Sequence, residues 1–329
     1  MVKPVLVAAI LAVFLAPLLV LSAATFEALE LSQNSSIIVD GDPSDWGYYT
    51  CTEYNTYTYT TIAGVQQWIW CDSFGDERTD FASPDKRVDL IQFRITGDTD
   101  NLYLLFIFND MSEFNIGNDG GAFIALTINR NGEGSGAWFA GDSDTEVDED
   151  ARWLYQIVVN LADSRFRGQG LRSLITSLTN NWGGVFYIVN DGWAFQSDSA
   201  VIGVNLDNRA VEVRIPWSMI GGAPSSESFF LRLSLITARG WSNYEENEGG
   251  TWDIGGFGTS DALDAMTTTG PNTWDEVGDG VVDYYVDVYF TTEPPYVPIP
   301  EPWVVSLVVG AVASVSVGLG IYLKRVKVE

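Results

Sequence analysis

Five carboxylate residues alternate along one short stretch of the chain and could bind a hard cation. They are Asp142, Asp144, Glu146, Asp148 and Asp150. In an extended backbone this spacing places all five carboxylates on one side, where calcium finds the oxygen ligands that it prefers. The stretch departs from an EF-hand, because its sixth position lacks glycine and Trp153 stands at the twelfth, where a bidentate acid belongs. It therefore predicts either a calcium site or a solvated acidic loop. Weaker candidates of the same kind are Asp261 with Asp264 and Asp283 with Asp287.

Aromatic residues are the second chemical signal. The chain has 12 tryptophans, more than one core needs, and aromatic faces stack on the apolar faces of sugar rings. Trp68 and Trp70 are two residues apart, so in a strand they point the same way and could form a platform. Trp241, Tyr244 and Trp252 lie in a segment rich in Gly, Asn and Glu, which predicts a loop. These five residues are the candidate ligand site, and core packing is the alternative for each tryptophan.

Cysteine and asparagine provide two covalent predictions. Cys51 and Cys71 are the only cysteines, and outside the cytoplasm a pair without a leftover thiol predicts a disulfide. The run Asn34-Ser35-Ser36 is a glycosylation sequon, which fits an exposed loop near the N-terminus.

The absence of histidine excludes whole classes of chemistry. Ser-His-Asp and Cys-His catalytic arrangements and histidine-ligated haem are impossible, and two cysteines without histidine cannot build a standard zinc site. Two carboxylates would suffice for a glycosidase, but no pair stands in a diagnostic motif. The formal net charge of −27 repels nucleic acid. We therefore expect a binding protein rather than an enzyme, with no haem, no zinc and no nucleic-acid partner.

Alternating apolar and polar residues predict strands throughout the folded part, residues 25–292. Residues 91–95 alternate in this way, and the turn at 97–101 leads into a second run at 102–108, a hairpin pattern. Another turn, at 207–209, joins the runs 201–206 and 210–215. Further strand-like runs are 54–61, 122–129, 153–161, 185–189, 229–238 and 281–290. Many antiparallel strands without helical crossovers predict an all-β fold, an antiparallel two-sheet β-sandwich forming one domain.

The two ends of the chain predict export and a membrane anchor. Residues 1–24 combine Lys3, an apolar run and small residues at 22–24, which is typical of a signal peptide. A proline-rich tether at 293–302 precedes the uncharged apolar segment 303–323, long enough to cross a hydrocarbon layer about 30 Å thick as a transmembrane helix. The basic tail, 324–329, should stay cytoplasmic, so the folded domain should lie outside, at the cell surface.

Three short motifs bracket almost the whole folded domain. Residues 38–46 read Ile-Val-Asp-Gly-Asp-Pro-Ser-Asp-Trp, and residues 211–221 include the run Ile-Pro-Trp after a strand. The third motif is Asn-Thr-Trp-Asp-Glu-Val at 272–277 together with residues 282–285. The motifs resemble those of DOMON-like sandwiches that include family 9 carbohydrate-binding modules, and the third looks like the end of modules appended to starch-degrading enzymes of hyperthermophilic archaea. The resemblance implies a β-sandwich that binds carbohydrate.

The same motifs also have a structural interpretation. Gly41 suits a tight turn after Asp40 because it tolerates positive φ, and Trp46 is large enough to close one end of a sandwich. Pro216 can end a strand where no backbone donor is needed, beside Trp217. We therefore expect structural roles for Asp40, Trp46, Pro216 and Trp217.

The tether has a resemblance of its own. Residues 297–302, the apolar segment and the basic end look like the C-terminal sorting signals that exosortase and archaeosortase enzymes recognise. Together the sequence predicts a membrane-anchored cell-surface protein that binds a polysaccharide or oligosaccharide, with structural calcium. The alternative is an envelope protein that packs among surface-layer subunits.

Overall fold

The computed structural model describes residues 28–31, 35–78, 89–111, 122–140, 143–161, 183–190, 192–196, 200–225, 229–239, 260–268 and 273–292. The chain divides into two compact units, Met1–Glu293 and Pro294–Glu329. The second unit and the expected signal peptide lie outside the described residues, as does the expected membrane span at 303–323. Within the described ranges, no helix has the length and apolar character needed to cross a membrane.

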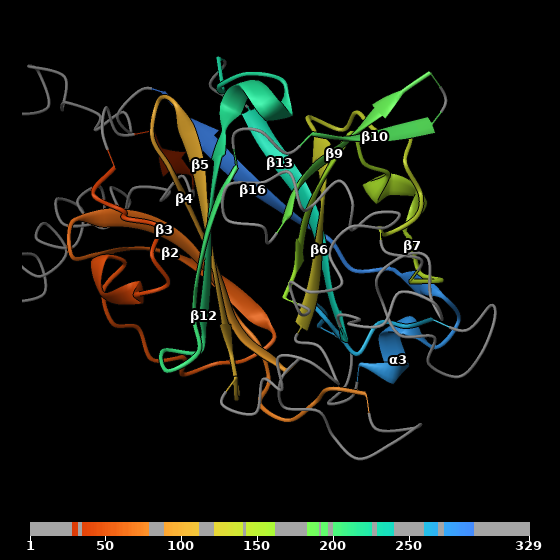
Figure 1. Ribbon diagram of the computed structural model, residues 1–329, viewed down its shortest axis with the longest axis horizontal. Helices are drawn as coiled ribbons and strands as arrows, with labels where there is room; N and C mark the ends of the chain where they lie inside the picture. The colour runs from red at the N-terminus through yellow and green to blue at the C-terminus, as the bar shows by residue number, and fades with distance from the viewer. Residues whose placement is uncertain are drawn as a thin grey trace, which may run out of the picture. The chain divides into compact units, whose positions relative to one another are not determined.

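The described strands form two large sheets (Figure 1). The eight-stranded sheet has the order β1 (Leu29–Glu30), β16 (Val286–Thr291), β13 (Phe229–Arg239), β6 (Ala122–Arg130), β8 (Tyr155–Asn160), β9 (Gly183–Val189) and β10 (Gly192–Gln196), and β14 (Asp264–Ala265) also pairs with β13. The six-stranded sheet has the order β11 (Val201–Asn205), β12 (Ala210–Pro216), β5 (Asn101–Phe108), β4 (Leu90–Gly97), β3 (Val65–Cys71) and β2 (Thr56–Ile62). Within these two sheets, all strand pairs are antiparallel except β1 with β16.

Short elements complete the described structure. A small parallel pair joins β7 (Glu146–Val147) to β15 (Val281–Val282). Single helical turns are η1 (Pro43–Asp45), η2 (Glu149–Ala151), η4 (Trp217–Ile220) and α3 (Trp274–Val277). The prediction of an all-β fold built from antiparallel sheets is therefore confirmed.

The main core contains side chains from both large sheets. In β5 the alternate residues Leu102, Leu104, Phe106 and Phe108 belong to this cluster, and β13 contributes Leu231, Leu233 and Leu235. Phe93 of β4 stacks on Phe106, with ring centroids 4.9 Å apart. Burying each such side chain contributes roughly 1.5–3 kcal/mol, so this alternation is what fixes the register of the strands.

Several outward-pointing residues of both sheets are covered as well. On β6, Phe123 and Ala125 point away from the main core and join a second cluster with Phe139 and Val147. On β5, Leu105 joins a third cluster with Trp46 and Ile37. The segments between strands therefore bury apolar surface on the outer faces of both sheets.

The prediction of one strand at 281–290 is wrong in one respect, because two strands, β15 and β16, lie there. Between β15 and β16, the Tyr284 N–H donates to Glu276 Oε1 at 2.7 Å, and its carbonyl accepts from Ser234 Oγ at 3.1 Å. Side chains thus take the place of a strand partner at Tyr284. The hairpin at 97–101 is confirmed, with Asp98 N–H donating to the Asn101 carbonyl at 2.9 Å.

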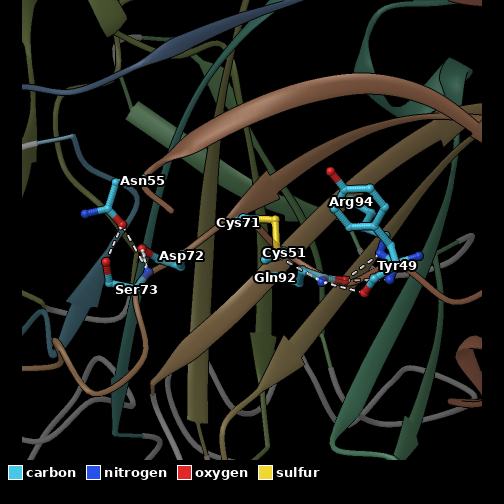
Figure 2. The surroundings of a disulfide bond; sticks show 8 residues. All are labelled: Tyr49, Cys51, Asn55, Cys71, Asp72, Ser73, Gln92 and Arg94. Carbon is cyan, nitrogen blue, oxygen red and sulfur yellow. Dashed lines mark hydrogen bonds between the residues drawn. A yellow bond between two sulfur atoms is a disulfide. The ribbon is translucent and has the colours of Figure 1, made fainter. Parts of the chain in front are cut away.

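The predicted disulfide is present. Cys51 and Cys71 are bonded, with Cα atoms 5.8 Å apart (Figure 2). Cys71 is the last residue of β3, and Cys51 lies in the segment between η1 and β2. The bridge therefore fastens an irregular segment to the six-stranded sheet.

Replacing both cysteines, Cys51→Ala with Cys71→Ala, should lower the free energy of unfolding by about 3 kcal/mol. The bridge joins residues 20 apart in sequence, and its main effect is to restrict the unfolded chain. Chemical denaturation of the variant and of the oxidised parent protein measures the difference. The reduced parent should resemble the variant, and equal unfolding midpoints for all three would contradict the prediction.

Candidate functional site

A hollow of about 660 Å³ opens on the outer face of the six-stranded sheet. Gln92 and Arg94 of β4 and Ile107 of β5 line it. Their sequence neighbours Phe93 and Phe106 belong to the main core, and successive strand residues point to opposite faces. The hollow therefore lies on the side of the sheet away from the other sheet.

Aromatic side chains are prominent around this hollow. Tyr48 is 89% exposed, Phe74 67% and Tyr54 55%, and all three line it. Polar residues also line the hollow, and together their side chains offer hydrogen-bond donors and acceptors: Asp42, Ser44, Asp72, Asn208 and Arg209. Such a mixture of exposed rings and hydrogen-bonding groups suits a ligand that has both apolar faces and hydroxyl groups.

A buried polar network holds the wall of the hollow in place (Figure 2). Arg94 Nη1 donates to the Gly47 carbonyl at 2.9 Å, and its Nε donates to Gln92 Oε1 at 2.8 Å. Gln92 Nε2 in turn donates to the Tyr49 carbonyl at 3.2 Å. Burial lowers the pKa of Arg94 to about 10, so the guanidinium stays charged at neutral pH. Two side chains of β4 thus position the backbone that carries Tyr48.

Glu212 of β12 anchors the beginning of the same wall. Its carboxylate accepts from Trp46 Nε1 at 2.8 Å, from Gly41 N at 2.6 Å and from Asp40 N at 3.0 Å. Gly41 has φ of 84°, and a Cβ there would lie 2.6 Å from Asn205 N, so no other residue fits. The first and second sequence motifs therefore meet at one buried carboxylate.

The structural interpretation of the motif residues agrees with these contacts. Trp46 is fully buried, Asp40 contributes its backbone, and Trp217 donates from Nε1 to the Asp98 carbonyl at 2.8 Å. Pro216 is the last residue of β12. Glu212 is not among the residues that the sequence predicts to have a role. Its position between two inward-pointing valines indicates an outward side chain, but nothing local indicates that residues 38–46 cover it.

Burial raises the pKa of Glu212 to about 7, and the nearby charge of Asp45 adds to this, although the three donors favour the ionised form. Because the folded-state pKa lies above the ordinary value of 4.5, the stabilisation from this group is complete below about pH 4.5 and is lost as the pH rises through about 7.

The Glu212→Gln variant should therefore lose stability relative to the parent protein at low pH and regain part of it above neutrality. Urea unfolding of both proteins between about pH 4 and 8 measures the difference in free energy. A constant offset is expected from the lost acceptor. Only a difference that changes with pH reports the raised pKa, and parallel profiles would refute it.

Near the hollow, three chain segments bring buried carboxylates together. Asp76 follows β3 in a turn, Asp89 lies just before β4, and Asp264 begins β14. One oxygen of each lies within 4.8 Å of the others. These residues are 4%, 0% and 0% exposed. Among the described residues, these three carboxylates form the set that is spaced closely enough to hold a metal ion.

Backbone and side-chain donors hold this cluster. Asp264 Oδ2 accepts from Leu90 N at 2.7 Å, and its Oδ1 accepts from Thr273 Oγ1 at 2.9 Å. Asp89 Oδ2 accepts from Gly75 N at 3.0 Å and from Asn109 Nδ2 at 2.5 Å. The cluster therefore has defined orientations for at least two of its carboxylates.

The electrostatics of the cluster are unfavourable without a counterion. Burial raises the pKa of Asp76 and of Asp89 to about 7. The pKa of Asp264 is raised well above its usual range by burial and then by the charges of Asp72, Asp76 and Asp89. Asp72 has a raised pKa for the same reasons, and it also lines the hollow. The two candidate sites are therefore neighbours.

The prediction that Trp68 and Trp70 form a ligand platform is wrong. They do point the same way, but both are 0% exposed and belong to the main core. Trp68 packs edge-on against Phe93, with ring centroids 5.7 Å apart. The inner face of β3 meets the other sheet, so its two large rings fill the core.

The alternating acidic run behaves as predicted only in part. Asp144, Glu146 and Asp148 are half-buried, and Thr145 and Val147 between them are buried, although Asp144 departs from the extended backbone with φ of 48°. The chain then turns into η2, and Asp148 caps it by accepting from Asp150 N at 2.7 Å. In the described part of this run, no three carboxylates lie close enough to share an ion. Because Asp142 lies outside the described residues, the calcium site expected in this run stays a prediction.

The remaining predicted site residues lie outside the described ranges. They are Asn34, Asp142, Trp241, Tyr244 and Trp252. Of the weaker acidic candidates, Asp287 forms an ion pair with Arg232 at 2.8 Å, and Asp264 belongs to the buried cluster. Asp76 and Asp89 were missed because they are distant in sequence from Asp264 and from any motif.

Comparison with known proteins assigns no family. No protein-family model matches the chain, and no curated protein matches it in sequence.

Proposed function

We propose that this chain is a membrane-anchored cell-surface protein whose β-sandwich binds a polysaccharide or oligosaccharide in the hollow and catalyses no reaction. The observation that carries the proposal is the exposure of Tyr48, Tyr54 and Phe74 around one concave surface. Exposed rings cost free energy in water, and a sugar ring that stacks on them recovers part of it.

The polar part of the lining supports the same ligand class. Asp42 and Asn208 offer acceptors, while Asn208 and Arg209 offer donors. Sugar hydroxyls both donate and accept, so they can use both kinds of group. The volume of about 660 Å³ is within the range of small-molecule sites, roughly 300–1,000 Å³.

The sequence supports the cellular setting. The resemblance of the three motifs to DOMON-like, family 9 carbohydrate-binding modules favours a sugar ligand. The apolar segment 303–323 with its basic tail favours a membrane anchor with the domain outside, retained or exchanged by a sorting enzyme.

An envelope or surface-layer interaction protein is the second candidate. In the described part of the eight-stranded sheet, β10 is the terminal strand, and its Trp193 is 45% exposed. An unpaired strand edge with an exposed aromatic ring can pair with another protein chain. This surface is separate from the residues that line the hollow.

Replacing Tyr48, Tyr54 or Phe74 singly with alanine should weaken oligosaccharide binding by about 1–3 kcal/mol and leave the melting temperature nearly unchanged. An exposed ring contributes to recognition and little to the core. Calorimetric titration of the purified full chain with oligosaccharides, chosen from a glycan screen, measures the affinity.

Trp138→Ala is the matched control, because Trp138 is 52% exposed and does not line the hollow. It should bind as the parent protein does. Equal affinities for all four variants would show that the hollow is not the binding site. If the parent protein binds no glycan but is retained on cell-envelope sheets, the envelope role is favoured.

A further inference from the structure

The spacing of the buried carboxylates fits the size of a single hard cation. Calcium–oxygen distances are about 2.3–2.6 Å, so two ligands on opposite sides of one ion are at most about 5 Å apart. One carboxylate oxygen from each of Asp76, Asp89 and Asp264 lies within 4.8 Å of the other two. One ion can therefore contact all three.

Unpartnered oxygens are the second observation that indicates a ligand. Asp76 Oδ1 and Asp89 Oδ1 are buried and accept no hydrogen bond within the described structure, and the same is true of Asp72 Oδ2. The residues that carry them are 4%, 0% and 0% exposed. A buried carboxylate oxygen without a donor is strongly unfavourable, and burying several together adds repulsion between their charges.

Donors already bond Oδ2 of Asp89 and both oxygens of Asp264, which orients these two carboxylates. Asn109 and Gly75 bond only Oδ2 of Asp89, so its Oδ1 remains available. Thr273 also holds Asp76, because its N–H donates to the Asp76 carbonyl at 2.9 Å. The arrangement is thus built by neighbouring segments and leaves free oxygens at the cluster.

We propose that Asp76, Asp89 and Asp264 bind one calcium ion, with Asp72 as a fourth carboxylate close by and water completing the coordination. Calcium suits the site better than magnesium, because it accepts irregular sets of six to eight oxygens, whereas magnesium requires a tight octahedron.

The ion would join the two large sheets. Asp264 belongs to β14, which pairs with β13 of the eight-stranded sheet. Asp89 leads into β4 of the six-stranded sheet, and Asp76 follows β3 of that sheet. A single cation on these ligands fastens one end of the sandwich, independently of what the hollow binds.

Calcium titration of the chelator-treated full chain should give one site, and calcium should raise the melting temperature because it binds the native state. Asp89→Asn and Asp76→Asn should each weaken calcium binding by at least about tenfold, since affinity follows the number of charged ligands. In chelator, however, both variants should melt at or above the parent temperature, because each removes a buried, unpartnered charge.

If the cluster binds a cation, the effect of each variant on the melting temperature should therefore differ between chelator and calcium. If the cluster has only a structural role, each variant would change the stability equally in both conditions. Glu146→Gln is the control, because it removes a carboxylate from the alternating run and leaves the cluster intact. The proposal would be overturned if Glu146→Gln lost calcium binding while Asp89→Asn kept it. So would identical melting curves of the parent protein with calcium and with chelator, at matched ionic strength.

Discussion

Carboxylate side chains act as hydrogen-bond acceptors for backbone N–H groups that lie outside the sheet ladders, and the irregular segments of this domain depend on them. Buried backbone donors must find acceptors, and a segment that covers a sheet face has no strand partner to supply them. Glu212 serves Asp40 and Gly41 in this way, and Asp264 serves Leu90. Asp98 serves Asn101 and Asp148 serves Asp150 in turns nearer the surface. Part of the acidic composition is therefore structural.

This use of carboxylates carries an electrostatic cost that differs between sites. At Glu212, three donors converge on one group and both carboxylate oxygens have partners, although burial still raises its pKa to about 7. At Asp76 and Asp89, oxygens remain without donors, and other carboxylates are close. The first arrangement supplies donors to both oxygens, whereas the second leaves buried oxygens without a donor. The same residue type thus builds a covering segment in one place and a candidate metal centre in another.

Much of the fold could be predicted from the sequence, because strand alternation is a local property. Residues 91–95 and 102–108 show which side chains point inward without reference to the rest of the chain. The covering layers could not be predicted in this way. Nothing near Trp68 and Trp70 indicates that the second sheet packs on them, and nothing near Glu212 indicates that Trp46 bonds to it across 166 residues. Asp76, Asp89 and Asp264 likewise come together only through the pairing of distant segments. The disulfide was predictable because only one pairing exists.

The disulfide between Cys51 and Cys71 also affects when the wall of the hollow becomes ordered. It fastens the segment that carries Tyr48 and Tyr54 to β3 before any ligand arrives. A wall that is already ordered gives up little conformational entropy on binding, so more of the contact energy is available as affinity. Thiols stay reduced in the cytoplasm and are oxidised outside it. Under the proposed function, a newly made chain would hold an unfastened wall until export, and recognition would begin only in the oxidising compartment where the bridge forms.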